Sequence, residues 1–284
     1  MARDHRDPST FGLFRREGDL LVPQDLARSL WKADQMHGVA TSGALGRAVE
    51  HAAIELGRDD LQPARFTVDL FKAPSMSPCS TRAEILREGP RILVVDAELI
   101  QDEECVARAR ALFLKPGETP SGVVWSDEEI PQPPPVDIAP PTEDPHVPFF
   151  FSDAGWSQDF AVHQNAGRKQ MWQITLPVVL GETTTPFQGL AGAADSTSMV
   201  VNWGSEGVQH INTDITLSIS RLPTGREVGL SALSWYANAG IATGTAVLFD
   251  RHGVLGTSTV TSLGNAKRSV DFTSENVLGE IGLA

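Results

Sequence analysis

The stretch HINTDITLSISRLP, residues 210–223, alternates apolar and polar side chains through its centre. Ile215, Leu217 and Ile219 occupy every second position, and threonine or serine fills the positions between them. This period of two residues predicts a β-strand with one buried face. Asp214 begins the polar row, so its carboxylate is either a solvated surface group or a group placed for chemistry.

The pattern around this strand occurs twice in the chain. Residues 64–115 match residues 213–264 at a constant separation of 149 positions, so that Pro74, for example, corresponds to Pro223. A constant separation over two hairpins indicates an internal repeat rather than a chance similarity. The sequence therefore predicts two copies of one structural unit.

Each copy is expected to contain a helix followed by a meander of strands. Apolar residues at helical spacing predict an amphipathic helix over residues 37–57, with Glu50 on its solvent-facing side. In the second copy, Thr185 as N-cap and Pro186 at the first position predict a helix within residues 184–204. The expected fold class is α+β, with a long helix packed against an antiparallel sheet in each copy.

A proline-rich acidic segment separates the two copies. Ten of the nineteen prolines lie between Pro116 and Pro148, and no lysine or arginine occurs between Pro116 and Gly167. Such a composition favours an extended linker over a packed element. We expect an N-terminal unit over residues 1–115, a linker over 116–149 and a C-terminal unit over 150–284.

Composition excludes several classes of function. The formal net charge is −13, and no basic stripe is present, which argues against a nucleic-acid partner. The longest apolar runs are too short for a membrane span, and the N-terminus does not resemble a secretory signal. Cys79 and Cys105 are too few for a disulfide framework and are expected to be buried. We therefore expect a soluble cytoplasmic protein.

Searches for familiar catalytic and metal-binding patterns find none. The seven histidines show no HxH, HxxxH or HExxH spacing, so no metal is predicted. The serine-hydrolase pattern GxSxG and the phosphate-binding pattern GxxxxGK are both missing from the sequence. A function without metal or other cofactor is therefore expected.

Four segments resemble the acyl-CoA thioesterase II family, whose fold is a double hotdog. They are MHGVATSGALG (36–46), LFKAP (70–74), NTDITLSISRLP (212–223) and GVLGTSTV (253–260). The resemblance implies hydrolysis of fatty acyl-CoA thioesters, with two hotdog units in one chain replacing the dimer of single-hotdog relatives. It also implies a role in fatty acid metabolism, an acyl-CoA partner and, as an expectation, a homo-oligomer.

The resemblance also implies a set of catalytic residues. Asp214 occupies the position of a water-activating carboxylate, a hydroxyl residue on the next strand falls at Ser234 or Trp235, and Thr261 stands where the family has glutamine. The beginning of the first helix would bind the thioester oxyanion and substrate, through His37, Gly38 and Asn212. Asp195, expected in the middle of the second helix, is the second candidate for the base.

Small helix residues are expected to leave room for the acyl chain, namely Gly43, Ala44, Ala191 and Ala194. Two other functions compete with thioester hydrolysis. The first is a non-catalytic acyl-CoA or acyl-chain binding protein, which Trp235 and Thr261 favour because they depart from the family pattern. The second is an enoyl-CoA hydratase of the hotdog type, which is disfavoured because no paired aspartate and histidine occur in a hydratase pattern.

Overall fold

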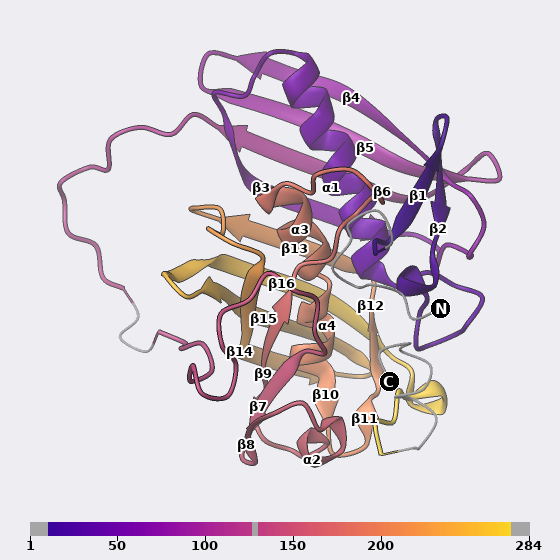
Figure 1. Ribbon diagram of the computed structural model, residues 1–284, viewed down its shortest axis with the longest axis vertical. Helices are drawn as coiled ribbons and strands as arrows, with labels where there is room; N and C mark the ends of the chain where they lie inside the picture. The colour runs from indigo at the N-terminus through magenta and orange to yellow at the C-terminus, as the bar shows by residue number, and fades with distance from the viewer. Residues whose placement is uncertain (1–10, 127–129, 274–284) are drawn as a thin grey trace.

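The computed structural model describes residues 11–126 and 130–273 (Figure 1). Both ends of the chain and three acids of the expected linker (Asp127, Glu128 and Glu129) lie outside the described residues. The first half contains β1 (Phe14–Glu17), β2 (Leu20–Pro23), the 3₁₀ turn η1 (Asp25–Ala27), α1 (Gly38–Glu55), β3 (Gln62–Leu70), β4 (Ser80–Gly89), β5 (Ile92–Gln101) and β6 (Glu104–Leu114).

The second half contains more elements, several of them short. They are β7 (Phe149–Ser152), β8 (Gly155–Ser157), α2 (Phe160–His163), β9 (Gln170–Ile174), α3 (Pro186–Ala193), α4 (Ser196–Asn202), β10 (Trp203–Gly204), β11 (Gly207–Val208), β12 (His210–Asn212), β13 (Asp214–Ile219), β14 (Glu227–Asn238), β15 (Ile241–Asp250), β16 (Gly253–Gly264) and the 3₁₀ turn η2 (Ala266–Arg268).

One large antiparallel sheet runs through both halves of the protein. Its central order is β4-β5-β6-β3-β13-β16-β15-β14. Strands β3, β4, β5 and β6 of the first half are equivalent to β13, β14, β15 and β16 of the second, so the order is the same from either end. Strands β9, β7 and β8 continue the sheet beyond β14. β5 and β15 cover ranges that correspond residue for residue at a separation of 149. The repeated sheet expected from the sequence is therefore confirmed.

The two halves also repeat a contact at the ends of β5 and β15. The N–H of Ser75 donates to Oε1 of Gln101 at 2.8 Å, and the N–H of Thr224 donates to Oδ2 of Asp250 at 3.2 Å. Donor and acceptor are 26 residues apart in both halves. A buried side chain thus holds the loop after β3 in the first half and the loop after β13 in the second half. It is the amide of Gln101 in the first half and the carboxylate of Asp250 in the second.

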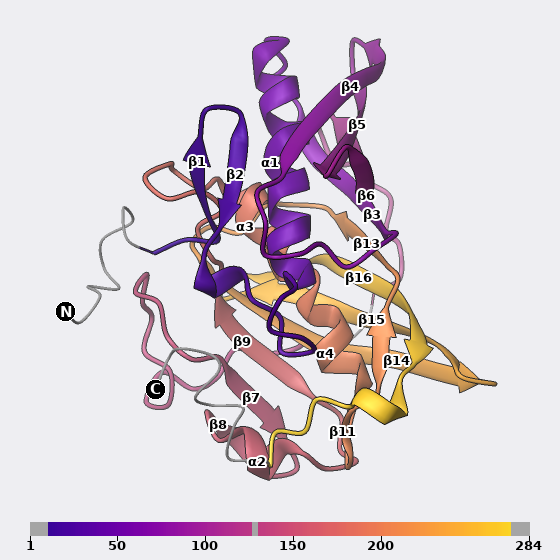
Figure 2. The ribbon, with the colours of Figure 1, turned by 90° about the vertical axis from the view of Figure 1, so that its right-hand side faces the viewer.

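The helices pack on the same face of the sheet, but the second helix is broken (Figure 2). α1 is continuous and lies on β4, β5 and β6, whereas α4 lies on β14, β15 and β16. α3 begins at Pro186 with Thr185 as its N-cap, as predicted, and ends at Ala193 before α4 starts. The expected single helix of the second copy is therefore two short helices.

α1 and α3 cross at very short range. A Cβ atom on Gly46 would lie 2.6 Å from Cβ of Ala191, and the Ser42 hydroxyl donates to the Ala191 carbonyl at 2.7 Å. The buried core lies between these helices and the sheet. Phe66 of β3 and Phe187 of α3 meet edge to face there, with ring centroids 5.6 Å apart, so one core joins both halves.

The segment upstream of α1 is a β-hairpin, and the linker is mostly without regular structure. Strands β1 and β2 form a hairpin over residues 14–23, and Gly18 at its turn has a φ of +60°. The described residues of the linker up to Pro148 form no helix or strand, and the chain makes a wide arc there (Figure 1), but Phe149, the last residue of the expected linker, already begins β7. The second part of the linker docks on the C-terminal half, where Ala139 packs against Trp172 and Phe249.

Candidate active site

The first turn of α1 lies against the break between α3 and α4. Gly38 is the first residue of α1, and Asp195 follows α3 at the start of α4. A Cβ atom on residue 38 would lie 2.1 Å from Oδ1 of Asp195, a distance that no side chain can tolerate. Glycine at this position is therefore what lets the carboxylate reach the helix terminus. The expectation that Asp195 lies inside a helix is wrong, because the helix ends before it.

Asp195 is held by polar partners in a partly buried place. Nδ2 of Asn212 donates to its Oδ1 at 2.9 Å, and the N–H of Val39 also hydrogen-bonds the carboxylate. Burial raises the pKa of the Asp195 carboxyl above its usual range, although these two hydrogen bonds oppose the shift. The carboxylate is fixed in position and has an increased affinity for protons, which are properties of a general base.

His37 is fixed as a neutral imidazole beside this carboxylate. Its Nδ1 accepts the N–H of Ala40 at 3.1 Å, and its Nε2 donates to the Leu26 carbonyl at 2.8 Å. One nitrogen accepts and the other donates, which is the pattern of the neutral ring. Burial lowers the pKa of His37, in agreement with this tautomer. His37 therefore caps α1, and both of its nitrogens are occupied, so it is poorly suited to take a proton from water.

The N–H of Gly38 differs from its neighbours in the first turn. The N–H groups of Val39 and Ala40 bond to Asp195 and His37, whereas among the described residues nothing in the protein accepts the Gly38 N–H. A helix N-terminus carries a partial positive charge and favours anions. A hydrogen-bond donor for a developing oxyanion is therefore available beside a carboxylate.

Asp214 occupies a different environment from Asp195. Its carboxylate accepts hydrogen bonds from the backbone N–H and the hydroxyl of Thr261 on β16. Thr261 is exposed, whereas Ile215, the residue after Asp214, is completely buried. Asn212 lies between the two aspartates, because its Nδ2 is also 3.5 Å from the main-chain oxygen of Asp214. The structure thus joins Asp214 with Thr261, and Asp195 with Asn212, Gly38 and His37.

Ser234 is remote from both aspartates in the sheet. It lies on β14 at a register shift and pairs with Thr245, and β15 and β16 separate it from β13. Together with Trp235 it lines an open cavity of about 470 Å³, here called the second cavity. The Trp235 indole N–H donates to Oδ1 of Asn202 at 3.0 Å. The structure therefore does not bring Ser234 into contact with Asp214 or Thr261.

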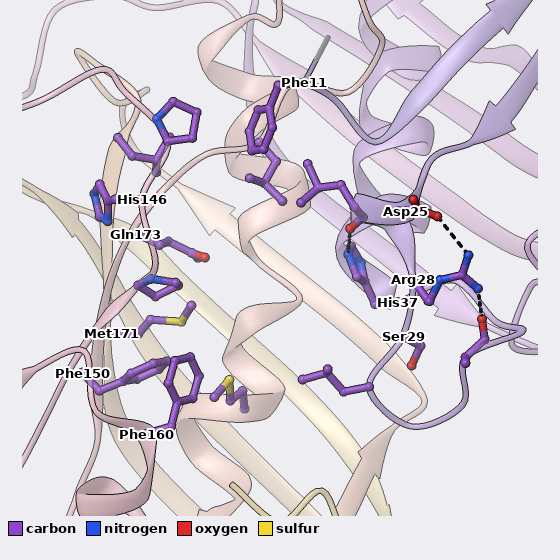
Figure 3. Close-up of a pocket in the computed structure, with 18 residues that line it drawn as sticks. Phe11, Asp25, Arg28, Ser29, His37, His146, Phe150, Phe160, Met171 and Gln173 are labelled. Atoms are coloured by element: carbon purple, nitrogen blue, oxygen red, sulfur yellow. Dashed lines mark hydrogen bonds and ion pairs between the residues drawn. The ribbon is translucent and has the colours of Figure 1, made fainter. Parts of the chain in front are cut away.

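A mainly apolar cavity of about 350 Å³, here called the acyl cavity, opens beside His37 (Figure 3). Its walls come from the segment around η1, the end of the linker, β7, α2, β9 and α4. Phe150 and Phe160 lie across the cavity from His37 in Figure 3. Gln173 lines the cavity and donates to the Ser196 hydroxyl at 3.1 Å. Gln173 thus connects the cavity wall to Ser196, the residue after Asp195.

The small helix residues do not form this cavity. Gly43, Ala44, Ala191 and Ala194 are buried and are not among the residues that line either cavity. Gly43 faces Val178 and the Cα of Gly192 instead, so small side chains here allow close helix packing. The expectation that they border an acyl channel is wrong, because the space they leave is filled by the neighbouring helix.

Glu50 of α1 forms the corresponding contact at the beginning of α3. Its Oε2 accepts hydrogen bonds from the Thr185 hydroxyl and from Nε2 of Gln188, both at 2.7 Å. Burial raises the pKa of the Glu50 carboxyl, and these two bonds oppose the shift. The expected solvent-facing position of Glu50 is therefore wrong. Each of α1 and α3 begins next to a carboxylate supplied by the other half of the protein.

Within residues 11–126 and 130–273, no group of three or more histidine, cysteine, aspartate or glutamate residues could hold a metal ion. No helix in the same part of the chain is long and apolar enough to cross a membrane. The site is thus described by a carboxylate, an amide, a helix N-terminus and an apolar cavity.

Two family profiles match the sequence. The acyl-CoA thioesterase N-terminal domain matches residues 27–114, and the acyl-CoA thioesterase C-terminal domain matches residues 130–263. Comparison with curated protein sequences gives no significant match. The two matched segments contain both of the repeated units seen in the sheet.

Solved structures of similar fold include a tesB protein of Mycobacterium avium subspecies paratuberculosis. It is 15% identical, with a TM-score of 0.63 over 88% of this chain and 95% of that one. The acyl-CoA thioesterase II TesB2 of Mycobacterium marinum is 15% identical, with a TM-score of 0.59 over 88% and 94%. A hot dog fold protein of Alicyclobacillus acidocaldarius is 16% identical, with a TM-score of 0.62 over 93% and 98%. These similarities identify the fold as a double hotdog.

Proposed function

This chain belongs to the acyl-CoA thioesterase family and is a thioester hydrolase, and we propose that it cleaves acyl-CoA with a water molecule activated by Asp195. The observation that carries this proposal is the position of the Asp195 carboxylate. It is held by Asn212 beside the N–H of Gly38, which has no acceptor among the described residues, and His37 connects this place to a cavity suited to an acyl chain. The catalytic groups are supplied by the chain itself, and no cofactor takes part in the proposed reaction.

In the proposed reaction, Asp195 takes a proton from water as the water oxygen attacks the thioester carbonyl carbon. The tetrahedral intermediate then collapses, the carbon–sulfur bond breaks and the coenzyme A sulfur receives the proton from Asp195. The products are a free acid and coenzyme A. Proton transfer by a placed side chain contributes roughly 10²–10⁴ in rate. The raised pKa of Asp195 suits both the acceptance and the return of the proton.

The beginning of α1 would stabilise the negative charge that develops on the carbonyl oxygen. Gly38 offers an N–H without a protein partner among the described residues, and the helix dipole adds to its effect. Removing a single donor of this kind typically costs roughly 10²–10³ in rate. His37 and Asn212 would act as positioning residues, since the first fixes the helix terminus and the second fixes the carboxylate.

Asp214 is the alternative base, together with Thr261 and, in the sequence-based scheme, Ser234. Its two carboxylate oxygens already accept the N–H and hydroxyl of Thr261. Asp214 and Thr261 do not line the acyl cavity; Asp195 is not a lining residue either, but His37, which interacts with it electrostatically, is. We therefore propose that Asp214 has a structural role, in which its hydrogen bonds to Thr261 hold the start of β13 against β16. Asp195 is then the general base.

Release of free thiol from acyl-CoA by Asp195→Asn and Asp214→Asn variants tests the choice. Both changes keep the shape of the side chain and remove the proton acceptor. We expect kcat to fall by roughly 10²–10⁴ for Asp195→Asn and to change little for Asp214→Asn. The reverse result would assign the base to Asp214. Circular dichroism of both variants establishes that each is folded.

We also propose that the chain is divided into two hotdog units and a linker. One hotdog unit would comprise residues 1–115 and the other residues 150–284, joined by the linker at 116–149. The site uses both units, because Gly38 and His37 come from the first and Asp195 and Asn212 from the second. A cytoplasmic location, a homo-oligomeric state and a role in fatty acid metabolism stay predictions.

A further inference from the structure

Three aromatic rings pack together between the acyl cavity and the second cavity. Phe150 and Phe160 line the acyl cavity, and Trp203 lines the second cavity. The centroid of the Trp203 ring is 5.1 Å from that of Phe150 and 6.1 Å from that of Phe160. These three residues are here called the aromatic barrier. The Trp203 ring on the wall of the second cavity thus packs against both phenylalanines on the wall of the acyl cavity.

Two elements contribute neighbouring residues to opposite sides of the aromatic barrier. On α4, Met199 lines the acyl cavity and Val200 lines the second cavity. Along β9 and the residue before it, Met171 lines the acyl cavity and Lys169 lines the second cavity. The same helix and strand thus border both cavities, and the aromatic barrier lies between them.

Packing holds Trp203 in place. Its ring is buried and contacts Phe272, with centroids 4.7 Å apart, and Nζ of Lys169 lies 6.0 Å from its centroid. Its indole N–H is buried and has no hydrogen-bond partner in the part of the chain that the structure describes. Shortening the side chain therefore removes ring volume from the barrier without breaking a hydrogen bond to the protein.

We propose that the aromatic barrier sets the longest acyl group that the enzyme accepts, with Trp203 as its specificity-determining residue. This inference rests on the proposed function of the acyl cavity. An acyl chain that enters beside His37 extends toward Phe150 and Phe160 and stops there. Removing the Trp203 indole joins the acyl cavity to the second cavity, which has a volume of about 470 Å³, and gives a longer chain a place to go.

The test compares Trp203→Leu and Phe160→Leu with the parent on acyl-CoA esters from butyryl to palmitoyl. We expect kcat/KM for palmitoyl-CoA, relative to octanoyl-CoA, to rise by about tenfold or more in both variants, because each accommodated methylene contributes to specificity. Phe249→Leu is the matched control, since Phe249 is a buried ring that packs on Trp172 and lines neither cavity. Its chain-length profile should equal that of the parent.

A binding measurement separates this inference from the proposed function. Calorimetry with octanoic and palmitic acids on the Asp195→Asn protein, with and without Trp203→Leu, needs no catalysis. A gain of about tenfold in affinity for palmitic acid, specific to the Trp203→Leu form, supports the barrier even if the parent hydrolyses no acyl-CoA. An unchanged length preference in both folded barrier variants, in hydrolysis and in binding, would overturn it.

Discussion

Thr67 of β3 and Thr216 of β13 face each other where the two halves of the sheet join. The two threonines are also 149 residues apart, which is the separation that relates the whole of one half to the other. A residue that pairs with its own counterpart must lie beside the two-fold axis that relates the copies. The pseudo-two-fold axis of the protein therefore passes between Thr67 and Thr216.

The Asp195→Asn substitution should lower activity and raise stability. Its folded-state pKa is raised by burial, so the stability that this group contributes is present at low pH and is lost as pH rises through the folded pKa. Asp195→Asn should therefore raise the melting temperature at neutral pH while it reduces kcat. The gain should vanish below about pH 4, where the carboxyl is protonated in the folded and unfolded chain alike. Calorimetric melting between acidic and neutral pH measures this; a lower melting temperature at neutral pH would contradict it.

The pH dependence of hydrolysis should report the same group. The base acts only when ionised, so kcat/KM should rise with pH through the pKa of Asp195. Because that pKa is raised, the rise should lie above the range of an ordinary aspartate. A pH–rate profile of the parent measures it. A rise centred at an ordinary carboxyl pKa would instead indicate a base outside this buried position.

Gly38→Ala should damage the site without harming the helix. Alanine is favourable in a helix, but its Cβ would lie 2.1 Å from Oδ1 of Asp195, so the carboxylate must move. We expect kcat to fall by roughly 10²-fold, the cost of a displacement of about 1 Å in a catalytic group. Gly117→Ala is the matched control, because nothing lies within 4 Å of a Cβ atom at that position. Equal activity of the two variants would refute the assigned contact.

The two cysteines should differ in reactivity. Cys79 is buried, and burial raises the pKa of its thiol to about 12. Cys105 is only partly buried. Since the thiolate is the reactive form, iodoacetamide should label Cys105 at least about tenfold faster than Cys79 in the folded protein. Peptide mass spectrometry after timed labelling measures both rates, and labelling in denaturant should remove the difference.

Asp250 should make the second unit sensitive to acid. Burial raises the pKa of this carboxyl, but hydrogen bonds from Arg221 and from the N–H groups of His252 and Thr224 together lower it below its usual value. The stability it contributes is therefore present above the ordinary carboxyl pKa and is lost as pH falls through the lowered folded pKa. Asp250→Asn should cost about 2 kcal/mol of unfolding free energy at neutral pH, as for hydrogen bonds to charged groups.

The cost of Asp250→Asn should shrink in acid, and urea unfolding at several pH values measures it. Asp34→Asn serves as a comparison, because Asp34 forms an exposed ion pair with Lys32 and should matter little. A constant cost of Asp250→Asn across the acid range would contradict the role assigned to its charge.

The repeated sheet could be predicted because its signals are local. Ile92 to Gln101 alternate between buried and more exposed positions along the whole of β5, and β15 shows the same alternation from Ile241 to Leu248. The cap at Thr185 could be predicted for the same reason, since capping depends on neighbouring residues. Structural features that depend on sequence periodicity or on neighbouring residues can thus be predicted from the sequence.

The candidate site could be predicted only in part, because it depends on distant contacts. Asp195 was the second choice, since no pattern along the chain links it to Asn212 or to Gly38. Poor helix propensity of aspartate was the one available signal for the break before α4. The acyl cavity draws on segments from η1 to α4, and such a combination has no signature in any single stretch.

Glu50 at the start of α3 bears on the evolutionary history of the chain. An ancestral homodimer of one hotdog unit would have carried two identical helix termini, each packed against the helix of its partner. After duplication and fusion, a substitution at one terminus no longer altered the other. In the present chain Glu50 contacts Thr185 and Gln188 at one terminus, whereas Asp195 lies against Gly38 at the other. Fusion would thus allow the two termini to take different roles.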